Sequence, residues 1–308
     1  MITYSIGLKN KFRGITVREG MLFEGPAGWA EWSPFLDYDD ATCVSWLRAA
    51  REAAEDGWPE PVRDRVPVNC TVPAVGPEKA AEIVRGSGCS TAKVKVAEPG
   101  QTLEDDLERV EAVRDAIGAG RVRIDANGAW SVDQAVQSLK QLRRFDLEYV
   151  EQPTATVEEL AEVRRRTDVL LAADESIRRA EDPLLVKKLD AADIAVLKVQ
   201  PIGGVRACLE IAEQIGLPVV VSSALETSVG IAAGVALAAV LPELPYACGL
   251  ATVSMFTSEL VAEPLLPVDG FLPVKRLAPD PVRLEAARAD ADRTAVWEER
   301  LRRVRSAG

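Results

Sequence analysis

A series of short apolar runs ends in charged residues, and these endings hold the side chains best suited to chemistry. In chain order the charged residues are Lys93 and Lys95, Asp125, Glu151, Asp174 and Lys198. Carboxylate oxygens are the ligands that a hard divalent cation such as Mg²⁺ or Mn²⁺ prefers. A lysine whose pKa is lowered by neighbouring cations can act as a base near neutral pH. The set therefore predicts proton transfer assisted by a divalent metal ion.

The spacing of these endings indicates how the chain would bring them together. Successive endings lie roughly 23 to 30 residues apart, close to the ~30 residues of a strand-plus-helix unit. A parallel strand buried on both faces reads as a continuous apolar run, and barrel enzymes carry their active site at the C-terminal ends of such strands. We therefore expect an α/β barrel whose mouth gathers the three carboxylates and the lysines.

Alternation along the strands sharpens this expectation. Lys93 and Lys95 should share one face, as should Asp125 and Asn127, because side chains alternate along a strand. One carboxylate at a strand end is often only a helix cap or loop anchor, and Lys93 could be a structural partner of a carboxylate. Three carboxylates on consecutive strands, flanked by lysines, favour a metal site. The chain has no histidine, which excludes zinc and non-haem iron sites built on imidazole.

Composition restricts the class of protein. The 308 residues carry a net charge of −11, which argues against nucleic acid and anionic membranes as partners. Five scattered cysteines without CxxC spacing suit the reducing cytoplasm, and no apolar run is long enough to span a membrane. The first residues lack a basic region followed by an apolar stretch, so we expect no secretory signal. A small carboxylate substrate remains compatible with this negative net charge, because a bound divalent ion would dominate the electric field at its site.

The pattern along the chain predicts a barrel between two shorter segments. Residues 1–60 read as a small antiparallel sheet followed by a helix over about 40–56. Residues 61–265 would form the barrel, with the first strand at 66–70 and the eighth near 246–253. Ser131 and Thr156 predict helix N-caps. Residues 266–308 would return to the N-terminal part of the chain.

Further polar residues near the predicted mouth are candidates for substrate binding. Ser228 would open a helix, where a carboxylate is favoured. Arg13 lies in a loop of the N-terminal sheet and could equally be a solvated charge, and Gly203–Gly204 reads as a helix start more readily than as an anion site. The substrate-binding candidates are Lys93, Asn127, Ser222, Ser223, Ser228 and Arg13.

Five segments together resemble the motif set of the enolase superfamily, and more narrowly of its muconate lactonizing enzyme subgroup. They are Thr91–Lys95, Ile124–Trp130, Tyr149–Pro153, Ala173–Ser176 and Leu197–Gly204. The resemblance runs from about residue 2 to 275. It implies a modified TIM barrel, (β/α)₇β, with an α+β capping domain built from both chain ends. It also implies Mg²⁺ bound by Asp125, Glu151 and Asp174, and a lysine base whose enediolate product the metal holds.

Within the subgroup, the short N-terminal part and the segments Trp29–Phe35 and Ser222–Ser228 resemble a dehydrating branch. That branch is a lyase that dehydrates 2-succinyl-6-hydroxy-2,4-cyclohexadiene-1-carboxylate, in a syn sense, during menaquinone biosynthesis. The resemblance implies that Lys95 removes the proton alpha to the carboxylate and that Lys198 stabilises the enediolate. Residues 247–254 lack the paired aspartates of dipeptide epimerases.

Other activities remain open at this point. In an N-succinylamino acid racemase, Lys95 and Lys198 would exchange the alpha proton from opposite faces. A metal-independent barrel of the class I aldolase type would instead use one of these lysines to form a Schiff base. A barrel without activity that serves only to bind is the remaining alternative.

Overall fold

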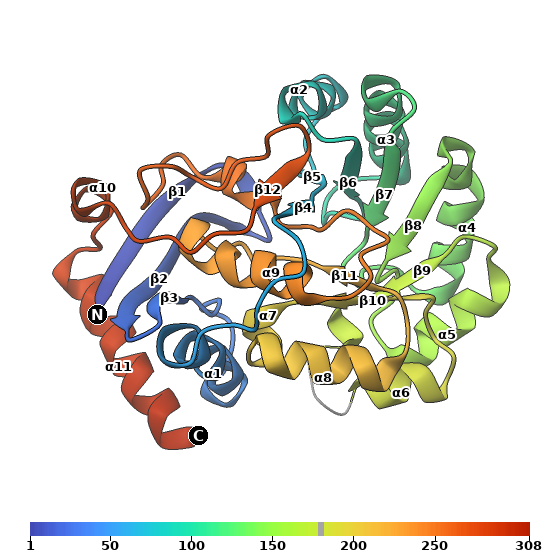
Figure 1. Ribbon diagram of the computed structural model, residues 1–308. Coiled ribbons are helices and arrows are strands. Elements are labelled where there is room, and N and C mark those ends of the chain that lie inside the picture. Colours follow the sequence, from blue (N-terminus) through green and yellow to red (C-terminus); the bar gives the residue numbers. More distant parts are fainter. Residues whose placement is uncertain (178–181) are drawn as a thin grey trace.

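The computed structural model describes residues 1–177 and 182–308 and shows two packed parts (Figure 1). The first is an antiparallel sheet of β1 (Ile2–Phe12), β2 (Ile15–Gly25) and β3 (Gly28–Trp32). Helix α1 (Asp40–Glu55) and the C-terminal helices α10 (Pro281–Ala286) and α11 (Ala291–Ala307) belong to the same part. Trp32 meets Trp297 edge to face, with ring centroids 5.5 Å apart, so both chain ends share one apolar core.

The second part is a curled parallel sheet whose strands follow one another in chain order. Its strands are β5 (Cys70–Val72), β6 (Thr91–Lys95), β7 (Arg121–Asp125), β8 (Leu147–Glu151), β9 (Leu171–Ala173), β10 (Ile194–Leu197) and β11 (Val219–Val221). Parallel bridges from Val68 to Cys248 and from Ser222 to Gly249 close the sheet into a barrel. The expected modified TIM barrel with a capping domain is confirmed.

Helices connect these strands and cover the outside of the sheet (Figure 1). They are α2 (Pro77–Ser87), α3 (Leu103–Ile117), α4 (Val132–Leu142), α5 (Val157–Arg166), α6 (Asp182–Lys188), α7 (Val199–Ile202), α8 (Val205–Ile215) and α9 (Ser228–Val240). Ser131 and Thr156 each form the predicted N-cap as part of a capping box. Within the described residues, no helix has both the length and the apolar character required to cross a membrane.

Two predicted strands differ from the structure. The predicted first strand at 66–70 is split after Pro67. The part before the split, β4 (Arg65–Pro67), pairs antiparallel with β12 (Phe271–Pro273), and the chain after Pro67 enters the barrel. A proline has no backbone N–H to donate to a ladder. The eighth strand is reduced to the bridges at Cys248 and Gly249, since residues Ala251–Met255 turn into a 3₁₀ helix.

A buried polar network joins the cap to the loop after β11. The Glu31 carboxylate, 3% exposed, accepts hydrogen bonds from the Tyr4 hydroxyl at 2.7 Å and from the backbone of Thr227 at 3.1 Å and Gly230 at 3.2 Å. Arg18 of the cap donates to the carbonyl of Leu225 at 2.8 Å. The N-terminus of α9 is therefore capped by a side chain of the capping domain.

We expect a neighbouring carboxyl group, Glu226, to make stability pH-dependent. Burial, with a further contribution from the charge of Glu31, raises its pKa to about 7, although Arg18 partly opposes this. The folded chain thus keeps a proton that the unfolded chain releases above its ordinary pKa near 4.5, so this contribution is complete below that value and is lost as the pH rises through 7. Relative to Glu226→Gln, the native chain should lose roughly 3 kcal/mol between pH 4.5 and 8. Urea unfolding at a series of pH values measures this, and parallel curves for the two proteins would contradict it.

Candidate active site

Three acidic side chains converge at the mouth of the barrel. Asp125 and Glu151 are the last residues of β7 and β8 and lie opposite each other in the register, and Asp174 follows β9 directly. Each is only 1% exposed. Strand order therefore places three carboxylates side by side, as the spacing of the sequence predicted.

Lys93 lies beneath these carboxylates as a fixed cation. It is 6% exposed, and its Nζ lies 2.7 Å from Glu151 Oε1 and 3.2 Å from Asp125 Oδ2. Burial lowers the pKa of Lys93, but the charges of Glu151 and Asp125 outweigh it and leave the pKa above its ordinary value. A permanently charged, enclosed ammonium is suited to holding negative charge and poorly suited to taking up a proton.

Lys95 and Lys198 stand on opposite flanks of the carboxylates. Lys95 Nζ lies 2.5 Å from Asp125 Oδ2 and 2.6 Å from Asn127 Oδ1, and Lys198 Nζ lies 2.5 Å from Asp174 Oδ2. Strands β7, β8 and β9 separate β6 from β10, so the two lysines rise from different walls of the barrel. The Phe12 ring, at the tip of the β1–β2 hairpin, lies 5.5 Å from Lys95 Nζ, which shows that the cap reaches the mouth.

The donor set fits a divalent cation. Glu151 Oε2 is buried and accepts no hydrogen bond from the described residues. Burial, followed by the charge of Asp125, raises the pKa of Glu151 to about 7, although Lys93 opposes this. Burial also disfavours the charge on Asp125, but Lys95 and Lys93 hold its pKa below the ordinary value. A full negative charge on Glu151, in addition to that on Asp125, therefore requires a compensating cation in this buried site.

In the present arrangement the lysines neutralise the carboxylates. Within residues 1–177 and 182–308, no three acidic, cysteine or histidine side chains already surround a common point closely enough to hold a metal. Asp125 and Asp174 each turn an oxygen toward a lysine ammonium at 2.5 Å. A divalent cation would compete with Lys95 and Lys198 for these same oxygens.

Asn127, Ser222 and Ser223 all follow barrel strands closely, Asn127 after β7 and the two serines after β11. Asn127 has a positive φ of 47°, and its backbone N–H donates to Asp125 Oδ1 at 3.0 Å, which orients that carboxylate. Ser222 is buried beside Gly249, and the Ser223 hydroxyl lies 2.8 Å from the Thr252 hydroxyl. Thr252 was not anticipated as a neighbour of Ser223, because the sequence placed it inside an eighth strand near 246–253, whereas it lies in the 3₁₀ helix Ala251–Met255.

The structure does not support a substrate contact by Ser228. This residue is fully buried, its N–H donates to Glu259 Oε1 at 2.9 Å, and its hydroxyl accepts from the N–H of Leu265 at 3.0 Å. The protein's own carboxylates already occupy the helix N-terminus where a substrate carboxylate was expected. Similarly, the start of α8 after Gly203–Gly204 meets Glu52, which accepts from Arg206 N–H at 3.3 Å, so this segment is a helix start.

Arg13 lies on the cap, where local partners hold it. Its guanidinium stacks 4.0 Å from the centroid of the Phe35 ring and pairs with Asp37 at 3.3 Å. It follows Phe12, the residue that covers Lys95. A role in substrate binding would require Arg13 to leave these partners, and it remains a proposal.

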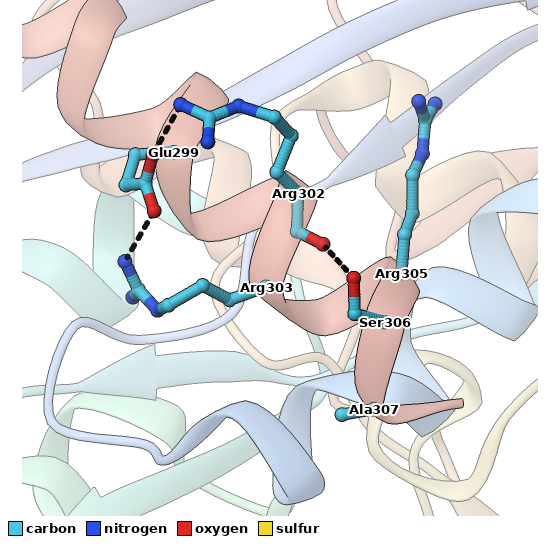
Figure 2. Close-up of a pocket in the computed structure, with 6 residues that line it drawn as sticks. All are labelled: Glu299, Arg302, Arg303, Arg305, Ser306 and Ala307. Atoms are coloured by element: carbon cyan, nitrogen blue, oxygen red, sulfur yellow. Dashed lines mark hydrogen bonds and ion pairs between the residues drawn. The ribbon is translucent and has the colours of Figure 1, made fainter.

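The surface also has depressions away from the mouth. One of about 620 Å³ lies along α11, and three of its six lining residues are arginines (Figure 2). There Glu299 lies between Arg302 and Arg303, which both pair with it. These are solvent-exposed ion pairs on one helix, so this depression carries none of the groups that the chemistry requires.

Known proteins similar to this chain agree with the geometry. A family model described as Enolase C-terminal domain-like matches residues 77–279, and one described as Enolase N-terminal domain-like matches residues 3–54. The chain is 64% identical over 305 residues to an o-succinylbenzoate synthase of Thermobifida fusca, covering 99% of this chain and 95% of that protein.

Solved structures of similar fold have low sequence identity. The muconate lactonizing enzyme of Pseudomonas fluorescens in complex with muconolactone superposes with a TM-score of 0.81 at 21% identity, covering 94% of this chain and 97% of that one. A dipeptide epimerase of Enterococcus faecalis, complexed with Mg and a dipeptide, gives 0.76 at 23% identity, covering 90% and 96%. These matches support the fold.

Proposed function

The chain belongs to the enolase superfamily, and we propose that it is an o-succinylbenzoate synthase, a lyase that removes water from a cyclohexadiene carboxylate. The observation that carries this proposal is the arrangement of Lys95 and Lys198 on opposite flanks of Asp125, Glu151 and Asp174. The high identity to a synthase along nearly the whole chain supports the same assignment.

In this proposal the substrate is 2-succinyl-6-hydroxy-2,4-cyclohexadiene-1-carboxylate. Lys95 Nζ takes the proton alpha to the ring carboxylate and returns a proton to the hydroxyl group as its C–O bond breaks, which releases water. One lysine can serve as both base and acid, because a syn elimination presents both groups on one face. Lys198 supplies positive charge on the other side of the site, and Lys93 compensates the carboxylates from below.

We assign Asp125, Glu151 and Asp174 as the residues that would hold Mg²⁺ or Mn²⁺. Bound there, the ion would supply a Lewis-acidic charge that makes the alpha proton more acidic and stabilises the enediolate. Asn127 would keep Asp125 oriented through its backbone N–H. Ser222, Ser223 and Arg13 would contribute to binding the succinyl arm.

The two lysines also make racemisation of N-succinylamino acids a second candidate, since Lys95 and Lys198 could exchange a proton from opposite faces. A Schiff base is disfavoured, because each lysine of the mouth is engaged by a carboxylate. Both candidates use a small carboxylate, with neither nucleic acid nor a membrane as partner. Five free, buried cysteines support the cytoplasmic location that we propose.

An assay of both reactions tests the proposal. With Mg²⁺ or Mn²⁺ present, we expect kcat/KM for dehydration, followed by loss of diene absorbance, to exceed kcat/KM for racemisation. Racemisation is followed by the uptake of solvent deuterium at the alpha carbon of N-succinylamino acids. Faster racemisation than dehydration would assign the chain to the racemases, and activity toward neither substrate would refute the proposal.

A further inference from the structure

One buried amide, Gln152, connects the strand ends that carry the acidic residues. It follows Glu151 directly, at the end of β8, and is 0% exposed. Its side-chain oxygen accepts from the backbone N–H of Asp174 at 3.0 Å and of Ser176 at 3.2 Å. The amide therefore binds the first residues after β9 to the end of β8.

The other side of the amide is equally engaged. Gln152 Nε2 donates to the carbonyl oxygen of Thr154 and to the hydroxyl of Ser176, both at 2.9 Å. Two accepted and two donated bonds use the full capacity of a primary amide. No other side chain of this length offers both an acceptor and a pair of donors, so the position is specific for glutamine.

The backbone of the same residue reaches the strands on both sides. Its N–H donates to Ala172 O of β9 at 2.8 Å, and its carbonyl accepts from Gly128 N–H, after β7, at 2.7 Å. Its φ is +39°, a conformation that costs a non-glycine residue of order 1 kcal/mol and persists where the surroundings impose it. Gln152 is thus fixed by contacts with the ends of three strands.

We propose that Gln152 is a positioning residue that sets the spacing between the Glu151 and Asp174 carboxylates. Its side chain accepts from the backbone N–H of Asp174, and its own backbone is bonded directly to that of Glu151. The inference rests on the proposed role of these carboxylates as metal ligands. Partners behind the ligands of a metal typically change its affinity by about 10- to 100-fold, and we expect an effect of this size here.

Titration calorimetry with Mn²⁺ on the metal-free, substrate-free protein tests this without reference to activity. Gln152→Met keeps the length of the side chain but cannot accept from Asp174, and should weaken Mn²⁺ binding by about 10- to 100-fold. Gln152→Asn keeps a buried amide but shortens its reach. It should weaken binding in the same way and serves if the methionine variant does not fold.

Two matched variants separate positioning from general damage to the barrel. Asn69 is another fully buried amide of the barrel; its side chain donates to the Cys70 carbonyl and accepts from Arg123. Asn69→Leu should lower stability to urea but leave Mn²⁺ affinity unchanged. Ser176→Ala removes one partner of Nε2 and leaves both bonds to the oxygen, so it too should bind Mn²⁺ like the native chain.

Glu151→Gln and Asp174→Asn complete the set of variants. If these two bind Mn²⁺ as the native chain does, the metal site itself is misassigned. If they lose Mn²⁺ while both Gln152 variants bind it like Asn69→Leu, only the positioning role is overturned. Weakened binding in the Gln152 variants and in the ligand variants, with the two matched variants unaffected, supports the inference.

Discussion

Lys95→Ala is expected to lose dehydration by several orders of magnitude in kcat while the fold is retained. General acid–base catalysis by one group contributes about 10²–10⁴-fold, and this substitution removes both the base and the acid. The side chain is partly exposed at the mouth and bonds to Asp125 and Asn127, so its loss leaves the apolar core intact. Steady-state rates, with circular dichroism as a check of folding, measure the effect.

The variants around this position sharpen the result. Lys95→Arg should not restore activity, because arginine keeps its proton at neutral pH. Lys198→Ala should also lose activity strongly, through loss of positive charge at the enediolate and not through loss of the base. Lys187, whose Nζ donates to the Gln214 carbonyl on the barrel surface, provides a control, and Lys187→Ala should be as active as the native chain. Appreciable dehydration by Lys95→Ala would overturn the assigned mechanism.

The strand ends could be predicted from the sequence because their signal is local. Each strand is a short apolar run that stops at a charged residue, and the near-constant spacing of these runs is a property of the repeated strand-plus-helix unit. Alternation of side chains then places Lys93 and Lys95 on one face, and both contact Asp125 in the structure.

The contacts of Ser228 give no support to its predicted role, because they depend on distant partners. A helix N-terminus in a sequence looks like a free anion site, but here Glu31, nearly 200 residues earlier in the chain, accepts from Thr227 and Gly230. Glu259 takes the Ser228 N–H. Nothing local marks Glu31 as a helix cap, since the contact exists only once the cap packs on the barrel.

Gln152 shows a similar limit. Its position next to Glu151 is visible in the sequence. Its use of all four hydrogen-bonding positions, however, depends on the bend of the chain after β8 and on the residues that follow β9. The eighth strand was predicted near 246–253, but its length was wrong for a different reason. Two bridging residues, Cys248 and Gly249, are too few to produce a periodic pattern.

Removal of divalent cations should abolish activity, and Mg²⁺ or Mn²⁺ should restore it. Exhaustive chelation followed by gel filtration leaves three buried carboxylates beside the ammonium groups of Lys93, Lys95 and Lys198, and the substrate carboxylate would then add negative charge to the same site. Full turnover by the chelated protein would sink the metal assignment.

The same metal should stabilise the fold, which gives a readout independent of turnover. A ligand at 100 times its Kd adds about 2.7 kcal/mol to the free energy of unfolding if it binds only the folded chain. Glu151→Gln keeps the shape of the side chain but removes the charge that a cation requires at Oε2, the buried oxygen without a partner among the described residues. Addition of Mg²⁺ should therefore raise the unfolding temperature of the native chain and leave that of Glu151→Gln almost unchanged. Glu226→Gln is the control, because it alters a buried carboxyl group in the loop between β11 and α9 and should respond to Mg²⁺ like the native chain. An equal response from Glu151→Gln would place the cation elsewhere.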